Sequence, residues 1–178
     1  MGHMRPEEDD KAGPLTRYLV EDHRRLDQLL QSAVARVDHV DQGAYTQFRA
    51  GLLRHIGMEE KILLPAAQQL RAGEPLPIAT KLRLDHGALA ALLMPAPTAA
   101  IIAKIRAILK DHNIVEESPG GLYETCDELA GEGAQLILAK LQAAPELTVM
   151  PHSDGPAVMG AVHRALERAG YDFGKDEI

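Results

Sequence analysis

The sequence predicts an all-α protein, an antiparallel up-down-up-down four-helix bundle with a C-terminal extension that adds a short helix. Two observations carry this prediction. Apolar residues recur every three or four positions in four long segments, which is the period of an amphipathic helix. Sustained alternation of apolar and polar residues is absent, and no Asn-Gly or Asp-Gly turn separates two apolar runs, so strands are not expected.

The four predicted helices are separated by residues that break helices. We expect helices over residues 15–37, 48–70, 78–93 and 101–116. Glycine and proline at 73, 75 and 77 separate the second from the third, and Pro95 and Pro97 separate the third from the fourth. Short loops between long helices favour antiparallel neighbours, which is the arrangement of an up-down bundle.

Size, charge and cysteine content narrow the class of protein. The 178 residues are 46% hydrophobic and 25% charged, as one globular domain with its own core requires. The net charge of −7 gives no basic field for a phosphate backbone, so no nucleic-acid partner is expected. Pro95 and Pro97 interrupt the longest weakly polar stretch, so we expect no membrane partner. The single Cys126 and the absence of a signal peptide favour the cytoplasm.

Three segments are expected along the chain. Residues 1–13 are charged and contain glycine and proline, which predicts a disordered lead-in, and its Met1-Gly2-His3-Met4 start resembles a cloning remnant. Residues 14–141 form the predicted bundle. Residues 142–178 form an extended, proline-containing strap and a weaker amphipathic helix that docks on the bundle.

Each predicted helix carries polar residues on its apolar face. These residues are His23 on the first helix, His55 and Glu59 on the second, His86 on the third, and His112 and Glu116 on the fourth. Residues four apart on a helix share one face, so each His-x3-Glu pair aims both side chains at one point. Successive histidines are 32, 31 and 26 residues apart, so antiparallel helices place all of them at one level.

This pattern favours a metal centre over a set of unrelated core residues. A single histidine on an apolar face is more often a hydrogen-bonded core residue, and a buried glutamate can pair with a buried cation. None of the four apolar faces carries Lys or Arg, however, and burying Glu59 and Glu116 uncompensated is costly. Six nitrogen and oxygen ligands exceed the four of a structural zinc. They suit two iron or manganese ions bridged by carboxylates.

Short motifs surround these six residues. They are Glu21-Asp22-His23, His55-Ile56-Gly57-Met58-Glu59-Glu60, Leu63-Leu64-Pro65, Asp85-His86 and His112-Asn113-Ile114-Val115-Glu116-Glu117. Over about residues 14–130 the sequence resembles the hemerythrin-like, or HHE cation-binding, family. The resemblance implies two iron ions in an oxygen- or carboxylate-bridged centre, with manganese or zinc as substitutes. It also implies four terminal ligands, His23, His55, His86 and His112, and two bridging carboxylates, Glu59 and Glu116.

The sequence departs from the oxygen-carrying hemerythrins at two points. Those proteins have a fifth histidine one turn from the position of His86, where this chain has Leu82 and Ala90. The remaining set of four histidines and two glutamates is similar to the iron-sensing and iron-centre-repair branches of the family. The carriers also place the carboxylate of the fourth helix where this chain has Glu117. Both glutamates stay candidates, and Glu116 is favoured because it mirrors Glu59.

The resemblance implies a non-haem di-iron protein that binds O2 or NO for sensing or for iron and redox homeostasis. The alternatives are a di-iron enzyme that turns over peroxide, NO or O2, and a protein that handles iron or repairs iron centres. The six ligands alone do not separate binding from turnover. Binding is the favoured interpretation.

Five further residues have relevant chemistry but weaker claims to a role. His39 lies ~24 Å along a helix from His23, too far to share a site, and is expected to be solvated. His152 and His163 fall outside the apolar faces and are expected at the surface. Cys126 is expected to be a small buried hydrophobe. Tyr18 is expected to pack in the core, with a role as a donor near the metals as the alternative.

Overall fold

The computed structural model describes residues 11–172, and in this range the chain forms helices and no strand. The predicted all-α class is confirmed. The predicted remnant Met1-Gly2-His3-Met4, most of the predicted lead-in and the last six residues lie outside the described range. In residues 11–172 no helix is both long enough and apolar enough to cross a membrane.

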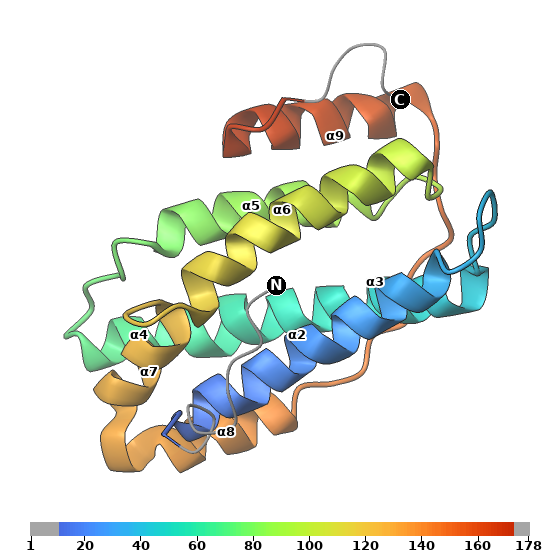
Figure 1. Ribbon diagram of the computed structural model, residues 1–178. Coiled ribbons are helices and arrows are strands. Elements are labelled where there is room, and N and C mark those ends of the chain that lie inside the picture. The colour runs from blue at the N-terminus through green and yellow to red at the C-terminus, as the bar shows by residue number, and fades with distance from the viewer. Residues whose placement is uncertain (1–10, 173–178) are drawn as a thin grey trace.

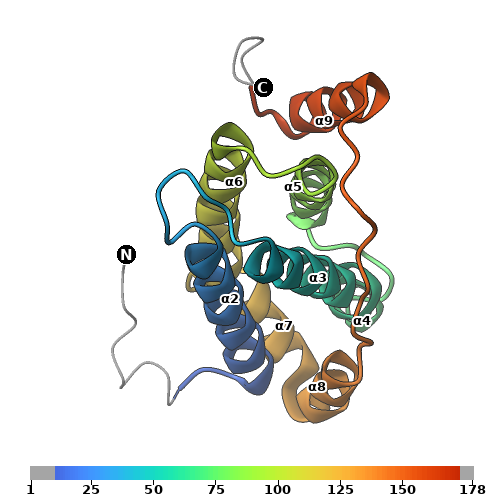
Figure 2. The same cartoon turned by 90° about the vertical axis from the view of Figure 1, so that its right-hand side faces the viewer.

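Four helical segments correspond to the predicted helices and lie side by side in Figures 1 and 2. They are α2 (Pro14–Ala33), α3 (Gln42–Met58) with its continuation η1 (Glu59–Leu63) and α4 (Leu64–Leu70), α5 (Ala79–Leu92), and α6 (Ala99–Glu117). Helix α2 packs against α3 and also touches α6, and α5 packs against α6. Buried apolar side chains from α2, α3, α5 and α6 join in one core cluster, to which α9 adds three more.

Three further α-helices follow α6, with a short 3-10 helix, η2 (Gly131–Gly133), between the first two. Helices α7 (Leu122–Ala130) and α8 (Ala134–Gln142) both contact α2 and lie together at one end of the molecule (Figure 1). Residues 143–155 contain no helix and run along the outside to α9 (Pro156–Ala169), as Figure 2 shows. Helix α9 packs on α5 and buries Val162, Ala165 and Leu166 against it and its neighbours. It occupies the segment in which the sequence predicts a C-terminal helix.

Helix α2 is shorter than the sequence pattern predicts. It ends at Ala33, whereas the apolar spacing continues to Val37, whose side chain is 90% exposed. The backbone N–H of Asp41 donates to the carbonyl oxygen of Ala33, and Asp38 adopts a φ of 60°. The chain therefore turns back one helical turn early, since this bond closes the loop towards α3. The apolar spacing in the sequence predicts a helix as far as Val37, because a local pattern does not show where the partner helix ends.

The second predicted helix contains a π-helical segment. The backbone N–H of Leu64 donates to the carbonyl oxygen of Glu59, five residues earlier, and the π-helical segment spans Glu59–Leu63. Pro65 comes just after this segment. It has no N–H to donate, and its ring would clash with the carbonyl oxygen four residues earlier if the helix kept regular α-helical geometry. The helix therefore widens by one residue at Glu59. Such segments are rare and are frequent at functional sites.

Helix α7 is fixed to its neighbours at both ends. The carboxylate of Asp127 accepts hydrogen bonds from the backbone N–H groups of Leu15 and Thr16 at 3.0 and 2.9 Å, and from the Thr16 hydroxyl at 2.7 Å. This carboxylate satisfies free donors at the N-terminus of α2. At the other end, the Cα of Gly121 lies so close to α6 that a Cβ would come within 2.7–2.8 Å of three backbone carbonyl oxygens.

We expect Gly121→Ala to lower the free energy of unfolding by about 1–3 kcal/mol, because the added methyl group forces α7 away from the end of α6. Gly87→Ala is the matched control. Gly87 lies inside α5, and a methyl group added there would meet no atom of a neighbouring element within 4 Å, so alanine should stabilise by roughly 0.5–1 kcal/mol. Urea unfolding measures both values, and equal effects at the two positions would contradict this account of how α7 is positioned.

Candidate metal centre

The structure brings all six residues singled out in the sequence into one buried cluster. Their exposed fractions are 0–7%. They form two groups of four, in each of which the possible ligand atoms lie within 4.8 Å of one another: His23, His55, Glu59 and Glu116 in one, and Glu59, His86, His112 and Glu116 in the other. The two groups share both glutamates. These buried side chains can hold metal ions.

The cluster forms a polar layer between two apolar regions of the core. Leu26 and Leu52, one turn from His23 and His55, belong to the core cluster described above. Leu19 and Met58, on the other side of the same histidines, belong to a second cluster that includes α7 and α8. Apolar side chains therefore enclose the polar layer from both ends, which lowers the local dielectric and strengthens every charge interaction within it.

Helix geometry places each His-x3-Glu pair as the sequence predicts. The His55 Nε2 atom lies 3.3 Å from Glu59 Oε1, and the His112 Nε2 atom lies 2.8 Å from Glu116 Oε1. The lone histidines complete the two groups from the neighbouring helices. His23 Nε2 lies 3.4 Å from Glu116 Oε2, and His86 Nε2 lies 3.0 Å from Glu59 Oε2.

The outer nitrogen of every histidine in the cluster bonds to a carboxylate of a different helix. Asp22 of α2 pairs with His55 of α3, Glu60 pairs with His86 of α5, Asp85 of α5 pairs with His112 of α6, and Glu117 of α6 pairs with His23 of α2, at distances of 2.5–3.1 Å. These four bonds form a closed ring through the helices. An ionised carboxylate only accepts hydrogen bonds, so each Nδ1 carries the proton and each Nε2 faces the centre. This is the usual arrangement of metal-binding histidines.

Two buried carboxylate oxygens fit the presence of a cation. Glu59 Oε2 and Glu116 Oε1 have no hydrogen-bond partner in the described part of the chain. Imidazole nitrogens lie 3.0 and 2.8 Å away, but their geometry is not that of an N–H···O bond. Buried polar atoms are rarely left without a partner. Both oxygens face the His86–His112 side, where a metal ion would satisfy them together with the two nitrogens.

Charges within the cluster shift the pKa values of its members in opposite directions. Burial lowers the pKa of His55, but the charge of Glu59 and the hydrogen bond with Asp22 outweigh it and raise the value to about 10. The pKa of His86 is likewise raised to about 10, against burial, by Glu116 and Glu59. Burial and the charge of Glu116 raise the pKa of Glu59, yet His55 and His86 lower it to about 2. In the metal-free protein, protons on the histidines therefore offset the two carboxylates.

A tyrosine that the sequence analysis does not single out lies inside the cluster. The fully buried Tyr123 of α7 donates its hydroxyl proton to Glu59 Oε1 at 2.7 Å. The hydroxyl oxygen of Tyr123 also lies 3.0 Å from His23 Nε2, 3.2 Å from His55 Nε2 and 3.1 Å from Glu116 Oε2. Burial and the two carboxylates raise its pKa well above the ordinary value. Tyr123 stands seven residues after Glu116, in a separate helix, so no helical spacing connects it with the cluster.

The C-terminal helix reaches the cluster through one carboxylate. Asp85, which pairs with His112, also accepts a hydrogen bond from the Tyr171 hydroxyl at 2.9 Å and forms an ion pair with Lys81 at 2.5 Å. Tyr171 lies just beyond the end of α9. The end of the C-terminal extension is therefore linked to a histidine of the cluster by two hydrogen bonds.

The structure separates the two glutamates that the sequence leaves as alternatives. Glu116 is fully buried within the cluster, whereas Glu117 is 30% exposed and bonds to the outer nitrogen of His23. Likewise, Glu59 is fully buried within the cluster, whereas Glu60 is partly exposed and bonds to the outer nitrogen of His86. In each Glu-Glu pair the first residue faces the centre, and the second supports a histidine of the neighbouring helix.

The remaining candidates lie outside the cluster. His39 is exposed in the turn after α2, and Cys126 is buried as expected, with burial and nearby acids raising its thiol pKa to about 12. His163 is half-buried on α9. His152 is also half-buried rather than at the surface, because its ring packs 6.0 Å from that of Tyr45. Tyr18 is half-buried against the second apolar cluster.

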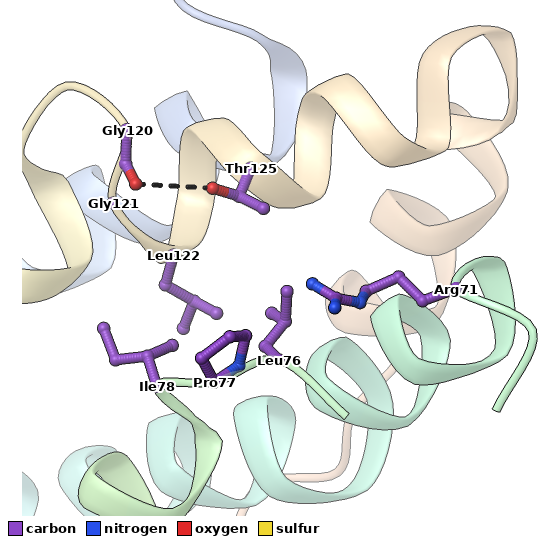
Figure 3. A pocket seen from close by; sticks show the side chains of 8 residues that line it. All are labelled: Arg71, Leu76, Pro77, Ile78, Gly120, Gly121, Leu122 and Thr125. Atoms are coloured by element: carbon purple, nitrogen blue, oxygen red, sulfur yellow. Dashed lines mark hydrogen bonds between the residues drawn. The ribbon is translucent and has the colours of Figure 1, made fainter. Parts of the chain in front are cut away.

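A surface pocket lies near the start of α7 but does not include the cluster. Figure 3 shows its lining residues, Arg71, Leu76, Pro77, Ile78, Gly120, Gly121, Leu122 and Thr125. The Thr125 hydroxyl donates to the Gly120 carbonyl oxygen at 3.4 Å. Arg71 is the one titratable side chain in this lining, and no lining residue belongs to the two His/Glu groups.

Comparisons with models of protein families, with curated proteins and with solved structures found no match to this chain. The interpretation of the cluster therefore depends on its residues and their geometry.

The metal-free protein should be most stable between about pH 4.5 and 6.5. The pKa values of His55 and His86 rise on folding from 6.5 to about 10, so their contribution is complete below pH 6.5 and is lost towards pH 10. The pKa of Glu59 falls on folding from 4.5 to about 2, so the stability that Glu59 contributes is lost as the pH falls from 4.5 towards 2. We expect the Tm of chelator-treated protein to drop by several degrees between pH 6.5 and 9.5.

Metal-loaded protein is the control for this measurement. A bound metal ion replaces the protons on the Nε2 atoms, so the Tm of the loaded protein should change less over the same range. A metal-free Tm that rises steadily from pH 6.5 to 9.5 would contradict the assignment of protons to the cluster.

Proposed function

We propose that this protein is a non-haem di-iron protein of the hemerythrin-like kind, in which α2, α3, α5 and α6 form an up-down-up-down four-helix bundle around the metals. In this proposal His23 and His55 bind one iron ion, His86 and His112 bind the other, and Glu59 and Glu116 bridge them. The observation that carries it is the pair of four-residue groups that share both carboxylates.

The donor set favours iron over a structural zinc ion. Each group offers two imidazole nitrogens and two carboxylate oxygens, with no thiolate, since Cys126 lies outside both groups. Mixed nitrogen and oxygen ligation is typical of non-haem iron and manganese. The four outer carboxylates orient the imidazoles and increase their basicity, as the partners of metal-binding histidines commonly do.

The enclosure of the cluster favours a small ligand. All six side chains are at most 7% exposed, and apolar side chains cover the polar layer from both ends. Four protein ligands leave positions open on an iron ion that prefers six. A diatomic molecule such as O2 or NO fits these conditions. We infer that the protein binds such a ligand for sensing or for iron and redox homeostasis.

The surroundings of His86 support this function over oxygen carriage. Leu82, one turn before His86, is fully buried in the second apolar cluster, and Ala90 follows one turn after it. Neither side chain can supply a third nitrogen to the iron on this side. More positions therefore stay available to an exogenous ligand than in the oxygen carriers.

Iron-loaded protein should contain two iron ions per chain. Replacing His55 or Glu59 with Ala should reduce the iron content to one ion or fewer and lower the Tm, because binding energy that stabilises the folded state is lost. Metal analysis and thermal unfolding measure both effects.

His39→Ala is the matched control for these variants, because His39 is exposed and remote from the cluster. It should keep two iron ions and the wild-type Tm. One tightly bound zinc ion per chain after expression and iron loading, or unchanged iron content in the variants, would contradict the di-iron proposal.

The di-ferrous protein should bind NO and should not act as a reversible oxygen carrier. We expect NO to give a stable optical change, and O2 to oxidise the iron without an adduct that releases O2 under vacuum. Stopped-flow absorption with each gas separately measures both. Repeated cycles of O2 uptake and release would overturn the functional ranking, and multiple turnovers of peroxide or NO would assign an enzyme instead.

A further inference from the structure

The hydroxyl oxygen of Tyr123 has the spacing of a ligand rather than that of an ordinary hydrogen-bonded phenol. It lies 2.7–3.2 Å from one possible ligand atom of each member of the first group, His23, His55, Glu59 and Glu116. A hydroxyl has one proton to donate, and Glu59 receives it at the shortest of these distances. Protonated histidine nitrogens can donate to the lone pairs of the hydroxyl oxygen, but no proton is left for the contact with the second carboxylate, Glu116, at 3.1 Å, and this contact needs a different explanation.

Coordination geometry supplies this explanation. Two ligands at about 2.1 Å from a metal ion and at right angles to each other are about 3 Å apart. An oxygen that lies at this spacing from four ligand atoms is at the position of a fifth ligand adjacent to all four. A phenolate oxygen is also a hard, anionic donor of the kind that iron accepts alongside imidazole and carboxylate.

The second group contains no comparable oxygen. Apart from each other, the Nε2 atoms of His86 and His112 contact only Glu59 and Glu116 within the described residues. The two unsatisfied carboxylate oxygens also face this side. The two halves of the centre are thus different, although their histidines and glutamates follow the same sequence pattern.

Contacts at both ends of α7 fix the position of Tyr123 next to the first group. Its first turn approaches α6 through Gly121, where no side chain fits, and its last turn is fixed to the start of α2 by Asp127. The ring of Tyr123 also packs against that of His23, with centroids 5.6 Å apart. The hydroxyl is therefore positioned by backbone contacts, not by a flexible side chain alone.

We propose that the hydroxyl oxygen of Tyr123 is a fifth protein ligand of the metal ion held by His23 and His55. With the bridging oxygen of an oxygen-bridged centre as sixth ligand this ion would have no open position, so a small exogenous ligand would bind at the His86–His112 side. This inference rests on the proposed di-metal function. When the oxygen binds the cation its O–H bond breaks and the proton leaves to solvent, as with other protein ligands that ionise on metal binding.

The test compares wild type, Tyr123→Phe and Tyr45→Phe in the ferric, iron-loaded state. Tyr45 is the matched control because it is also fully buried but lies in the other core cluster, with a hydroxyl that has no partner among the described residues. Phenolate bound to ferric iron gives a visible charge-transfer band, and resonance Raman excitation in this band enhances tyrosine ring modes. We expect both signals in wild type and Tyr45→Phe, and neither in Tyr123→Phe.

Ligand stoichiometry provides a second measurement. Titration of the di-ferrous proteins with NO should give one NO per chain in wild type and Tyr45→Phe. Tyr123→Phe should bind two, because removal of the hydroxyl opens the His23–His55 side. Iron content is measured in the same samples, so that a change in stoichiometry is separated from loss of metal.

Incorporation of ring-deuterated tyrosine into wild type gives the Raman result without any substitution, and an isotope shift of the enhanced modes is expected. Two bound iron ions with no charge-transfer band, no tyrosine modes and the same NO stoichiometry in Tyr123→Phe would overturn the inference, leaving Tyr123 as a hydrogen-bond donor to Glu59. Absence of bound iron in wild type would instead overturn the proposed function.

Discussion

The burial of two carboxylates, Glu59 and Glu116, is the constraint on which the rest of the structure depends. Both are fully buried between two apolar clusters, where an uncompensated charge is costly. Among the described residues no buried cationic side chain offsets them, since the buried Arg49 donates its Nε proton to the carbonyl oxygen of Leu93 instead. The compensation falls to four imidazoles and one phenol, which carry protons and can bind metal ions. Any metal ion bound here would therefore act on the stability of the fold through these same atoms.

The ring of outer hydrogen bonds explains how such a centre is held in register. Each bond joins the acid of one helix to the histidine of the next, so no helix can slide or rotate without breaking two of them. Neighbouring residues on one helix contact different partners. His23 faces the centre, whereas Asp22, the residue before it, orients His55 of α3. The ring fixes the tautomer of every imidazole and the relative height of the helices at once. The same four bonds therefore support the packing of the helices and the orientation of the imidazoles.

The segments after α6 change a nearly symmetric centre into an asymmetric one. Two helical pairs with the same His-x3-Glu-Glu pattern produce two similar halves, and the halves differ in what the later segments add to each. Helix α7 brings the hydroxyl of Tyr123 to one half, and the end of α9 brings that of Tyr171 to Asp85, behind His112 of the other. One hydroxyl contacts the inner ligand atoms and the other an outer carboxylate. The asymmetry of the centre therefore originates outside the four helices that supply the ligands.

The sequence by itself determined the all-α class, the approximate helices and the six residues that meet at the centre. Periodicity and spacing along one helix are local properties, and an acid on an apolar face is conspicuous without coordinates. Only the tertiary structure decided the end of α2 at Ala33, the crossed pairing of acids and histidines, and the presence of Tyr123. These features depend on contacts between helices, which a local pattern does not contain. The choice between Glu116 and Glu117 was also of this kind, because consecutive residues differ only in the direction each side chain takes towards a neighbouring helix.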